Sequence, residues 1–338
     1  MLKCQYSQIG WLVEESSQDL RKPAREIAHS AQMELAVIIL NWNAAADTVR
    51  CVRYVTAWKH LQPTIWVVDN GSTDDSAQII SRECPHVRLI RNTTNLGYAG
   101  GNNRGITEAL SVENAPILLL NNDAFIEEKD VVKLLDTLQE DEHIGIIGPL
   151  IFDADDRDRL LTAGGRNPVL NHHSHILRLA PGGPVRVVEY VPGTVLLGRP
   201  ELFRTVGLLD ETYFFNVEIA DLCMRARQHD YISAIDTRAR AFHALDRRPS
   251  GFRGTLYIYY FIRNRFIYIR KFYKGLSIPL MVFWGFYSLF LSLKLQINGD
   301  PATARAVRLG LSDGLYGRFG GQNERVLSQM GKVIAPQL

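Results

Sequence analysis

Four short predicted strands in the first part of the chain each end at an Asn or Asp residue, and helix-like stretches separate them. They lie at 35–40, 64–68, 87–91 and 117–120, and all except 87–91 (VRLIR) are continuous apolar runs. Apolar runs without polar alternation are typical of strands that are buried on both faces of a parallel sheet. The helical stretches lie at about 47–60, 74–83 and 101–110. Alternation of this kind predicts an α/β fold with a doubly wound, mostly parallel sheet.

Polar residues gather where these predicted strands end. They are Asn41, Asp69, Asn92 and the triplet 121–123. Ligands of open α/β sheets bind at the carboxyl ends of the strands, so this clustering indicates a binding crevice there. The alternative is that these side chains only cap the helices that follow, a task for which one residue per helix suffices.

Length and composition are those of an ordinary globular protein. The chain has 338 residues, of which 46% are hydrophobic and 22% are charged. Because 38 Lys and Arg face 36 Asp and Glu, no overall field favours nucleic acid as a partner. Four scattered Cys and the lack of an apolar leader favour a cytoplasmic protein. We expect an extension at 1–32, a catalytic α/β domain at 33–245, and a basic loop with a helical region at 246–338.

Two segments at the strand ends carry features of a nucleotide site. In 69–74 (DNGSTD) the first carboxylate can accept from a nucleobase N–H, and Gly71 permits a tight turn beside a ligand. The three glycines of 95–103 (NLGYAGGNN) allow close approach to a ligand and open a helix whose N-terminus favours negative charge. The chain lacks GxxxxGK[ST] and GxGxxG with a downstream acid, which excludes the P-loop and dehydrogenase patterns. Oxygen atoms of 121–123 (NND) suit a cation that bridges two phosphates.

In this order the motifs resemble the inverting GT-A glycosyltransferase family 2, which includes rhamnosyltransferase-like enzymes. The matching segments are VIILNWN, VVDNGSTD, NLGYAGGNN, LLLNNDA, VPGTVLLGRPELFRTVGLLDETYFF, EIADLCMRARQHDY and AFHA. They cover about 35–243, and 259–273 is similar to tails in the same group. The resemblance implies a GT-A fold and sugar transfer from a nucleotide-diphosphate donor to a glycan or lipid-linked acceptor in surface polysaccharide synthesis.

The resemblance also implies donor and metal contacts. The donor-binding residues it implies are Asn41, Asp69, Asn95, Gly100, Asn121, Arg247 and Arg248. The metal ligands it implies, for Mn²⁺ or Mg²⁺, are Asp123 and His243. The two arginines could instead belong to a solvated loop, and His243 could be a satisfied buried histidine. The donor nucleotide stays open among dTDP-, UDP- and GDP-sugars.

Catalytic roles fall on the segment that begins at Glu218. The resemblance implies Glu218 as the general base, with Asp221 three residues later on the same helix face as a supporting acid. Many relatives carry two adjacent acids here, whereas this chain has Ile219 after Glu218. That departure leaves two alternatives, namely acids that only favour a helix N-terminus and an inactive nucleotide-sugar-binding or scaffold protein. Asp210 is implied at the acceptor, with a turn-forming role equally open.

Two further segments call for an interpretation. Residues 276–293 carry no charge, and the aromatic helix before them contains several cations. Those cations are Arg263, Arg265, Arg270, Lys271 and Lys274. This pattern suits peripheral attachment to the inner face of an anionic membrane, with internal packing, a homodimer and a true span as alternatives. The histidines at 172, 173 and 175 lack carboxylates at ligand spacing, so we expect no metal there.

Overall fold

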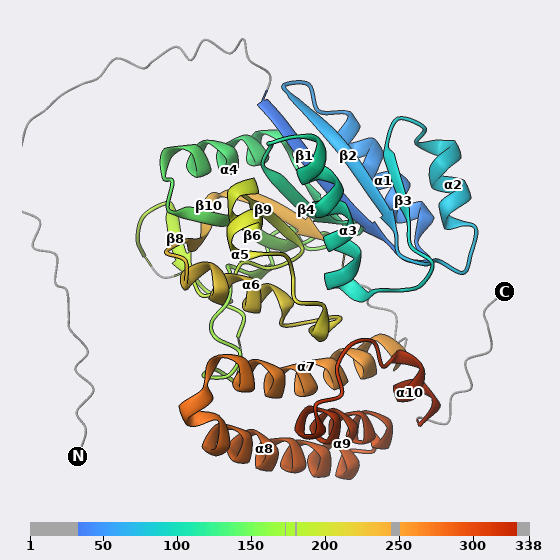
Figure 1. Ribbon diagram of the computed structural model, residues 1–338, viewed down its shortest axis with the longest axis vertical. Coiled ribbons are helices and arrows are strands. Elements are labelled where there is room, and N and C mark those ends of the chain that lie inside the picture. The colour runs from blue at the N-terminus through green and yellow to red at the C-terminus, as the bar shows by residue number, and fades with distance from the viewer. Residues whose placement is uncertain (1–32, 173, 180, 245–250, 330–338) are drawn as a thin grey trace, which may run out of the picture. The chain divides into compact units, whose positions relative to one another are not determined.

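A mixed sheet forms the centre of the protein. The structure is a computed structural model, and it describes residues 33–172, 174–179, 181–244 and 251–329. The strand order is β3-β2-β1-β4-β9-β6-β10-β5, with β7 paired to β6 and β8 to β10 (Figure 1). The strands are β1 (Met33–Asn41), β2 (Leu61–Asp69), β3 (Arg88–Arg91), β4 (Ile117–Asn121), β5 (Ala124–Ile126), β6 (Ile144–Asp153), β7 (Leu160–Thr162), β8 (Val185–Val188), β9 (Val195–Gly198) and β10 (Ile232–His243).

Helices follow the strands in the first half and form the C-terminal region by themselves. Those of the α/β part are α1 (Ala45–Thr56), α2 (Ser76–Glu83), α3 (Gly97–Val112), α4 (Glu128–Glu140), α5 (Pro200–Val206) and α6 (Glu218–Arg227), with a 3₁₀ turn η1 (Glu211–Tyr213). The C-terminal ones are α7 (Gly251–Phe272), η2 (Lys274–Leu276), α8 (Ser277–Ile297), α9 (Pro301–Tyr316) and α10 (Asn323–Ser328).

The first four strands confirm the predicted parallel arrangement. β1 lies between β2 and β4 and runs parallel to both, and β3 runs parallel to β2. In this register Asn41 stands opposite Asp69, and Leu40 stands opposite Asn121. The polar residues that end these strands therefore share one edge of the sheet.

Two hydrophobic cores explain why the strands carry continuous apolar runs. Alternate residues of β1 point to opposite faces. Leu35, Val37 and Ile39 belong to the core that α1, α2 and α4 cover, whereas Ala36 and Ile38 belong to the core on the side of α3. All five side chains are fully buried. Helices on both faces make the sheet doubly wound, as predicted.

The second half of the sheet is less regular than the first. The stretch 187–197 falls in two strands, β8 and β9, because the segment VPGT turns the chain between them. Residues 232–243 form one strand, β10, whose pairing with β6 shifts in register between Asp236 and Arg240. β9 runs antiparallel to both β4 and β6, which makes this half of the sheet mixed.

The C-terminal helices share a core with the sheet. Ile262 and Phe266 of α7 and Trp284 of α8 belong to the same cluster of buried side chains as Ile38 of β1. α7 and α8 each pack along α9. The domain boundary expected at residue 245 stays a prediction, and the expected extension at 1–32 lies outside the described residues.

The interpretation of two α7 cations as membrane-facing is wrong. Arg263 and Arg265 are fully buried. Arg263 donates to the carbonyl oxygens of Tyr213 and Gly320, and Arg265 Nε donates to that of Pro168 at 2.8 Å. Buried guanidinium groups of this kind hold backbone carbonyls, so they connect α7 to the rest of the protein.

Candidate active site

The ends of β1 and β2 form a buried polar network. Asn41 Nδ2 donates to Asp69 Oδ1 at 2.8 Å, and the same Oδ1 accepts from Ser72 Oγ at 2.5 Å. Asn41 Oδ1 accepts from Thr48 Oγ1 at 2.7 Å. Asn41 is fully buried and Asp69 is 4% exposed. Asn41 therefore orients the carboxylate of Asp69, and its own amide is engaged within the protein.

The loop before α3 is held by a second group of amides. Asn70 Nδ2 donates to Asn95 Oδ1 at 3.1 Å and to the Gly97 carbonyl at 3.0 Å. Asn95 Oδ1 also accepts from the backbone N–H of Gly97 at 2.8 Å. Asn95, which we predicted at the donor, thus caps the start of α3, and its donor contact stays a prediction.

Two glycines of α3, Gly101 in the NLGYAGGNN segment and Gly105 just after it, let this helix approach the sheet. A Cβ atom at Gly101 would lie 2.4 Å from Leu40 Cδ1, and one at Gly105 would lie 2.6 Å from Ile38 Cγ2. At Gly100 a Cβ would meet Leu96 Cβ at 2.7 Å. Close packing therefore explains these glycines, and the predicted donor contact of Gly100 would involve its backbone.

The segment Gly193–Thr194 connects the tip of β4 to the start of α6. The backbone N–H of Asn121 donates to the Thr194 carbonyl at 3.0 Å, and Tyr98 Oη donates to the Gly193 carbonyl at 2.6 Å. Tyr98 lies within electrostatic range of Glu218, which contributes to the raised pKa of this tyrosine, although burial is the larger cause. Tyr98 thus lies near Glu218 and is hydrogen-bonded to the turn that also holds the backbone of Asn121.

Asp123 and His243 meet at the end of β4, as the resemblance implied for the metal ligands. His243 Nε2 lies 3.1 Å from Asp123 Oδ1. The contact follows from strand pairing, because His243 at the end of β10 stands opposite Ala124 at the start of β5. The two side chains are 22% and 34% exposed, so both reach solvent.

The chemistry of this pair fits a hard divalent cation. Mg²⁺ and Mn²⁺ accept carboxylate oxygen, and such a cation is often held by one or two protein ligands together with substrate phosphates and water. Within the described residues no group of three or more His, Cys, Asp or Glu side chains converges as a metal cage. A cation at this pair would therefore depend on the donor for further ligands.

Glu218 is an acid in an unusual environment. It is 5% exposed, and its Oε2 atom is buried with no hydrogen-bond partner among the described residues. Burial, helped by the nearby negative charge of Asp221, raises the pKa of Glu218 from 4.5 to about 7. A carboxyl group with a pKa near neutrality is matched to proton transfer at physiological pH.

The backbone that leads into Glu218 is strained. Phe214, Asn216 and Val217 have φ values of 63°, 72° and 76°. Asn tolerates a positive φ better than most residues, whereas the bulky Phe and the β-branched Val are outliers there, each at a cost of about 1–3 kcal/mol. Strain of this size persists only where neighbouring structure fixes the conformation.

α7 supplies that fixation through two adjacent residues. Asn264 Nδ2 lies within hydrogen-bond distance of three carbonyl oxygens, at 3.1 Å from Tyr213, 2.8 Å from Phe215 and 2.6 Å from Asn216. Arg263 Nη2 donates to the Tyr213 carbonyl at 2.7 Å. Both side chains are fully buried. α7 therefore sets the path of the segment that delivers Glu218.

A charged cluster lies beside this segment. Lys271 Nζ of α7 lies 2.6 Å from Asp210 Oδ2 and 2.6 Å from Asp221 Oδ2. Asp221 is fully buried, and its Oδ1 also accepts from Arg225 Nε at 2.6 Å. A carboxylate that is buried and paired twice suits the supporting role predicted for Asp221.

Asp210 occupies the cap of η1. Its Oδ1 accepts from the backbone N–H of Thr212 at 3.0 Å and from Thr212 Oγ1 at 2.6 Å. Burial raises the pKa of Asp210, but the hydrogen bonds from Lys271 and Thr212 outweigh it and hold this pKa below its ordinary value. The structure thus shows the turn-forming alternative, and an acceptor contact stays a prediction.

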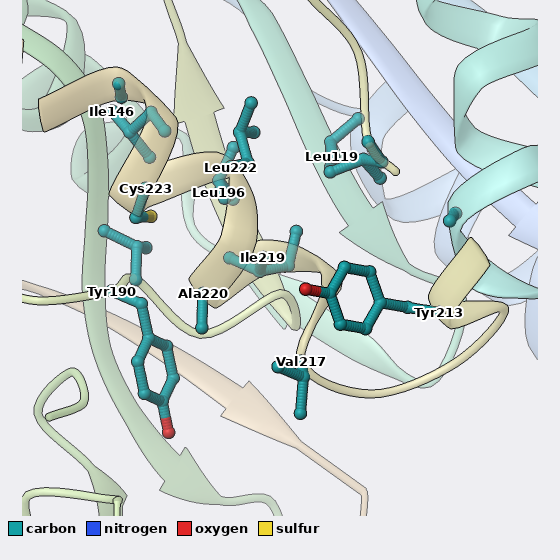
Figure 2. Packing of buried hydrophobic residues seen from close by; sticks show 14 of the residues in the cluster. Leu119, Ile146, Tyr190, Leu196, Tyr213, Val217, Ile219, Ala220, Leu222 and Cys223 are labelled. Atoms are coloured by element: carbon teal, nitrogen blue, oxygen red, sulfur yellow. The ribbon is translucent and has the colours of Figure 1, made fainter. Parts of the chain in front are cut away.

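Ile219, which stands where many relatives carry a second acid, is part of the hydrophobic core. It is 5% exposed and belongs to the same cluster as Leu119 and Leu196. Figure 2 shows it beside Leu222, near the ring of Tyr213. A carboxylate buried at position 219 would need a partner for its charge. Of the two positions where many relatives carry acids, only 218 therefore offers a carboxylate for chemistry in this chain.

Two predicted features fall partly outside the described residues. Arg247 and Arg248 lie within 245–250, which the structure does not describe, so their donor contacts stay predictions. Of the histidine group, position 173 is also outside. His172 Nε2 contacts Tyr287 Oη, and His175 Nδ1 lies 3.3 Å from Thr162 Oγ1.

Sequence reasoning missed the residues that position this site. Composition describes Lys271 and Arg263 as cations of a basic aromatic helix, and it assigns no role to Asn264. A stronger signal was present, because the three consecutive polar residues 263–265 spread over more than half of the helix circumference. With aromatic residues all around them, they could not all face solvent.

Comparison with known proteins agrees with this geometry. Residues 36–187 match the family described as Glycosyl transferase family 2. The N-acetylglucosaminyl-diphospho-decaprenol L-rhamnosyltransferase of Mycobacterium tuberculosis is 30% identical over 234 residues, which cover 62% of this chain and 75% of that protein. The low-salt glycan biosynthesis hexosyltransferase Agl10 of Haloferax volcanii is 26% identical over 239 residues, covering 69% and 75%.

A solved structure shows the same fold. The mannosyltransferase PcManGT from Pyrobaculum calidifontis, in complex with GDP-Man and Mn²⁺, superimposes with a TM-score of 0.55 at 11% identity, and the match covers 88% of this chain and 92% of that one. This likeness supports the fold class. The matching family and the rhamnosyltransferase of similar sequence support the kind of enzyme. The chain belongs to glycosyltransferase family 2 and is a glycosyltransferase of GT-A fold.

Proposed function

We propose that this glycosyltransferase moves a sugar from a nucleoside-diphosphate donor to a hydroxyl of a glycan or lipid-linked acceptor, with inversion at the anomeric carbon and with the help of Mn²⁺ or Mg²⁺. The observation that carries the proposal is the carboxyl group of Glu218. It is buried, has one oxygen without a partner among the described residues, and has its pKa raised to about 7. A group in that state is suited to take a proton and is poorly suited to a structural role.

The donor would lie across the carboxyl ends of β1, β2 and β4. Asp69, oriented by Asn41, would accept a hydrogen bond from the base, and Asn121 would border the ribose or phosphate. Asn95, Gly100, Arg247 and Arg248 complete the proposed donor contacts. Their support is the resemblance and the common strand edge, where ligands of open α/β sheets bind.

Asp123 and His243 would hold the cation that contacts the donor diphosphate. Support comes from the 3.1 Å approach of their side chains at the strand edge and from Mn²⁺ in the similar mannosyltransferase structure. When bound, the cation would supply charge neutralisation for the departing diphosphate.

Glu218 would act as the base. The acceptor hydroxyl loses its proton to the free Oε2 atom while its oxygen forms a bond to the anomeric carbon, and the bond from that carbon to the diphosphate breaks on the opposite side. The nucleoside diphosphate leaves with the bonding electron pair. Asp221 supports this base through its charge, and Asp210 would border the acceptor.

The acceptor class is supported by the named relatives. The mycobacterial relative is named for transfer to a diphospho-decaprenol glycolipid and the haloarchaeal relative for glycan biosynthesis. We therefore propose that the acceptor of this enzyme is a saccharide, free or carried on a lipid diphosphate, and that the reaction belongs to surface polysaccharide synthesis. The names of the rhamnosyltransferases among the relatives support rhamnose as the transferred sugar.

A thermal-shift panel tests the donor side. Melting temperatures are measured with dTDP-rhamnose, UDP-hexoses and GDP-mannose, each with and without Mn²⁺. A ligand that binds only the folded state at about 100 times its dissociation constant adds about 2.7 kcal/mol of stability, so one donor class should raise the melting temperature in the presence of Mn²⁺.

The matched variants are Asp123→Ala and, as control, Asp75→Ala, which removes an exposed acid at the start of α2. The shift should disappear in Asp123→Ala and stay in Asp75→Ala. No shift with any donor in wild type would contradict the proposal. A donor-induced shift in wild type, together with no turnover on any acceptor, would favour the inactive binding or scaffold protein.

A further inference from the structure

One side of α8 is an exposed apolar surface, which we call the α8 face. Its large side chains are Ile278, Val282, Phe283, Phe286, Leu289, Phe290, Leu293 and Ile297, each at least half exposed. At 3.6 residues per turn they fall within an arc of roughly 140° centred on Phe286. Side chains of this size are usually covered when they form a continuous stripe, so the α8 face has a partner.

The opposite side of α8 is fixed to the protein. Trp284, Ser288 and Ser292 are buried there. Trp284 Nε1 donates to the Val169 carbonyl at 3.1 Å, and Ser292 Oγ donates to the Ala304 carbonyl at 3.1 Å. Lys274–Ile297 is the segment within the described residues that is long and apolar enough to cross a membrane. Crossing would break these contacts with the loop before β8 and with α9, so the packed helix lies along a surface.

Charge identifies the kind of surface. α8 contains no acid, and exposed lysines stand near both of its ends, Lys274 and Lys294. Residues 251–329 contain eleven Lys and Arg against three Asp and Glu, and nine of the eleven remain when the buried Arg263 and Arg265 are set aside, whereas the whole chain is nearly balanced at 38 against 36. Lysines that flank an apolar helix face bind anionic lipid head groups while the apolar side chains enter the acyl region.

A second copy of the chain fits this surface less well. Two α8 faces related by a two-fold axis would place Lys274 beside Lys294 of the other copy if antiparallel, or beside the same lysine if parallel. Either arrangement brings like charges together with no acid on the helix to pair with them, which is unfavourable at an interface.

We propose that α8 is an in-plane membrane-docking helix that places its apolar face in the outer part of an anionic lipid bilayer. The inference goes beyond the sugar transfer proposed above and does not depend on it. It explains why a helix that is anchored through its inner side keeps eight large apolar side chains exposed. It also places the enzyme at the surface where a lipid-carried acceptor would be found.

Vesicle sedimentation tests this inference with the full-length chain. Wild type should bind vesicles of phosphatidylglycerol and phosphatidylcholine more strongly than vesicles of phosphatidylcholine alone, and added salt should weaken the binding. Phe286→Asp changes a side chain that is 70% exposed, and it should lower the partition coefficient at least about tenfold. Val112→Asp, at an exposed apolar position of α3, is the matched control and should bind like wild type.

Three results would overturn the inference. The first is wild type that stays in solution with anionic vesicles, and the second is Phe286→Asp that still binds them like wild type. The third is a wild-type dimer in sedimentation velocity that Phe286→Asp converts to monomer without any vesicle binding. The donor-induced thermal shift should be equal in wild type and Phe286→Asp, so a failure here is distinguishable from a failure of the proposed function.

Discussion

Replacing Glu218 by Gln should make the protein more stable and much less active. The folded protein holds the Glu218 proton up to a pKa of about 7, whereas the ordinary value is 4.5. Between these values the folded state binds a proton that the unfolded state has released, so the stability of wild type falls as pH rises through this window. A difference of about 2.5 pKa units corresponds to about 3 kcal/mol.

Urea unfolding of wild type and Glu218→Gln at several pH values measures this effect. The variant cannot ionise at this position, so the two proteins should be similar near pH 4.5, and the variant should be more stable by up to about 3 kcal/mol at pH 8. Glu142→Gln, which replaces an exposed acid, is the control and should follow wild type at all pH values.

Turnover of the same variants supplies the second half of this prediction. Loss of a general base lowers kcat by about 10²- to 10⁴-fold, while donor binding should not change. In wild type the rate should rise with pH up to a plateau, with an acid limb near 7, because only the ionised carboxylate accepts a proton. An equally active Glu218→Gln, or one without extra stability at pH 8, would refute the reasoning.

Three further variants test the supporting structure. Asn264→Ala leaves the carbonyl oxygens of Phe215 and Asn216 without this donor, so the free energy of unfolding in urea should fall by about 2–5 kcal/mol. The variant should also lower kcat more than donor affinity, and wild-type kinetics would contradict the positioning role of Asn264. Gly105→Val inserts side-chain atoms against Ile38 and should cost about 1–3 kcal/mol, whereas equal stability would show that α3 can move away from the sheet. Lys271→Ala removes the cation that Asp210 and Asp221 share, and it should lower the free energy of unfolding by about 1–3 kcal/mol. Because this lysine is partly exposed, high salt should reduce the loss, and a loss that salt leaves unchanged would contradict this account.

Much of the donor side could be predicted because it is local. A buried parallel strand needs a continuous apolar run. Where such a strand ends at the edge of the sheet that binds ligands, polar residues follow the run. Asn41 and Asp69 therefore appear in the sequence as run ends, and the register of β1 and β2 brings them together. The contact between Asp123 and His243 needed the resemblance, because 120 residues separate them.

The segment that leads into Glu218 could not be predicted in the same way. Asn264 contacts carbonyl groups about fifty residues earlier, and its role depends on a backbone conformation that no sequence pattern records. Arg263 and Arg265 were misinterpreted because a basic aromatic helix suits a membrane and a buried carbonyl-binding helix equally well in composition. The contacts of α8 with the loop before β8 and with α9 are also not recorded in any sequence pattern, so the sequence alone left peripheral attachment, internal packing, a homodimer and a span open.

The most direct test of the central claim is the rate of nucleoside-diphosphate release from the donor in the presence of Mn²⁺, compared between wild type and Asp123→Ala. If Asp123 and His243 hold the cation at the diphosphate, the variant should lose at least about 100-fold in rate, and EDTA should abolish turnover of wild type. Release by Asp123→Ala at the wild-type rate, or wild-type turnover that EDTA leaves intact, would contradict the account.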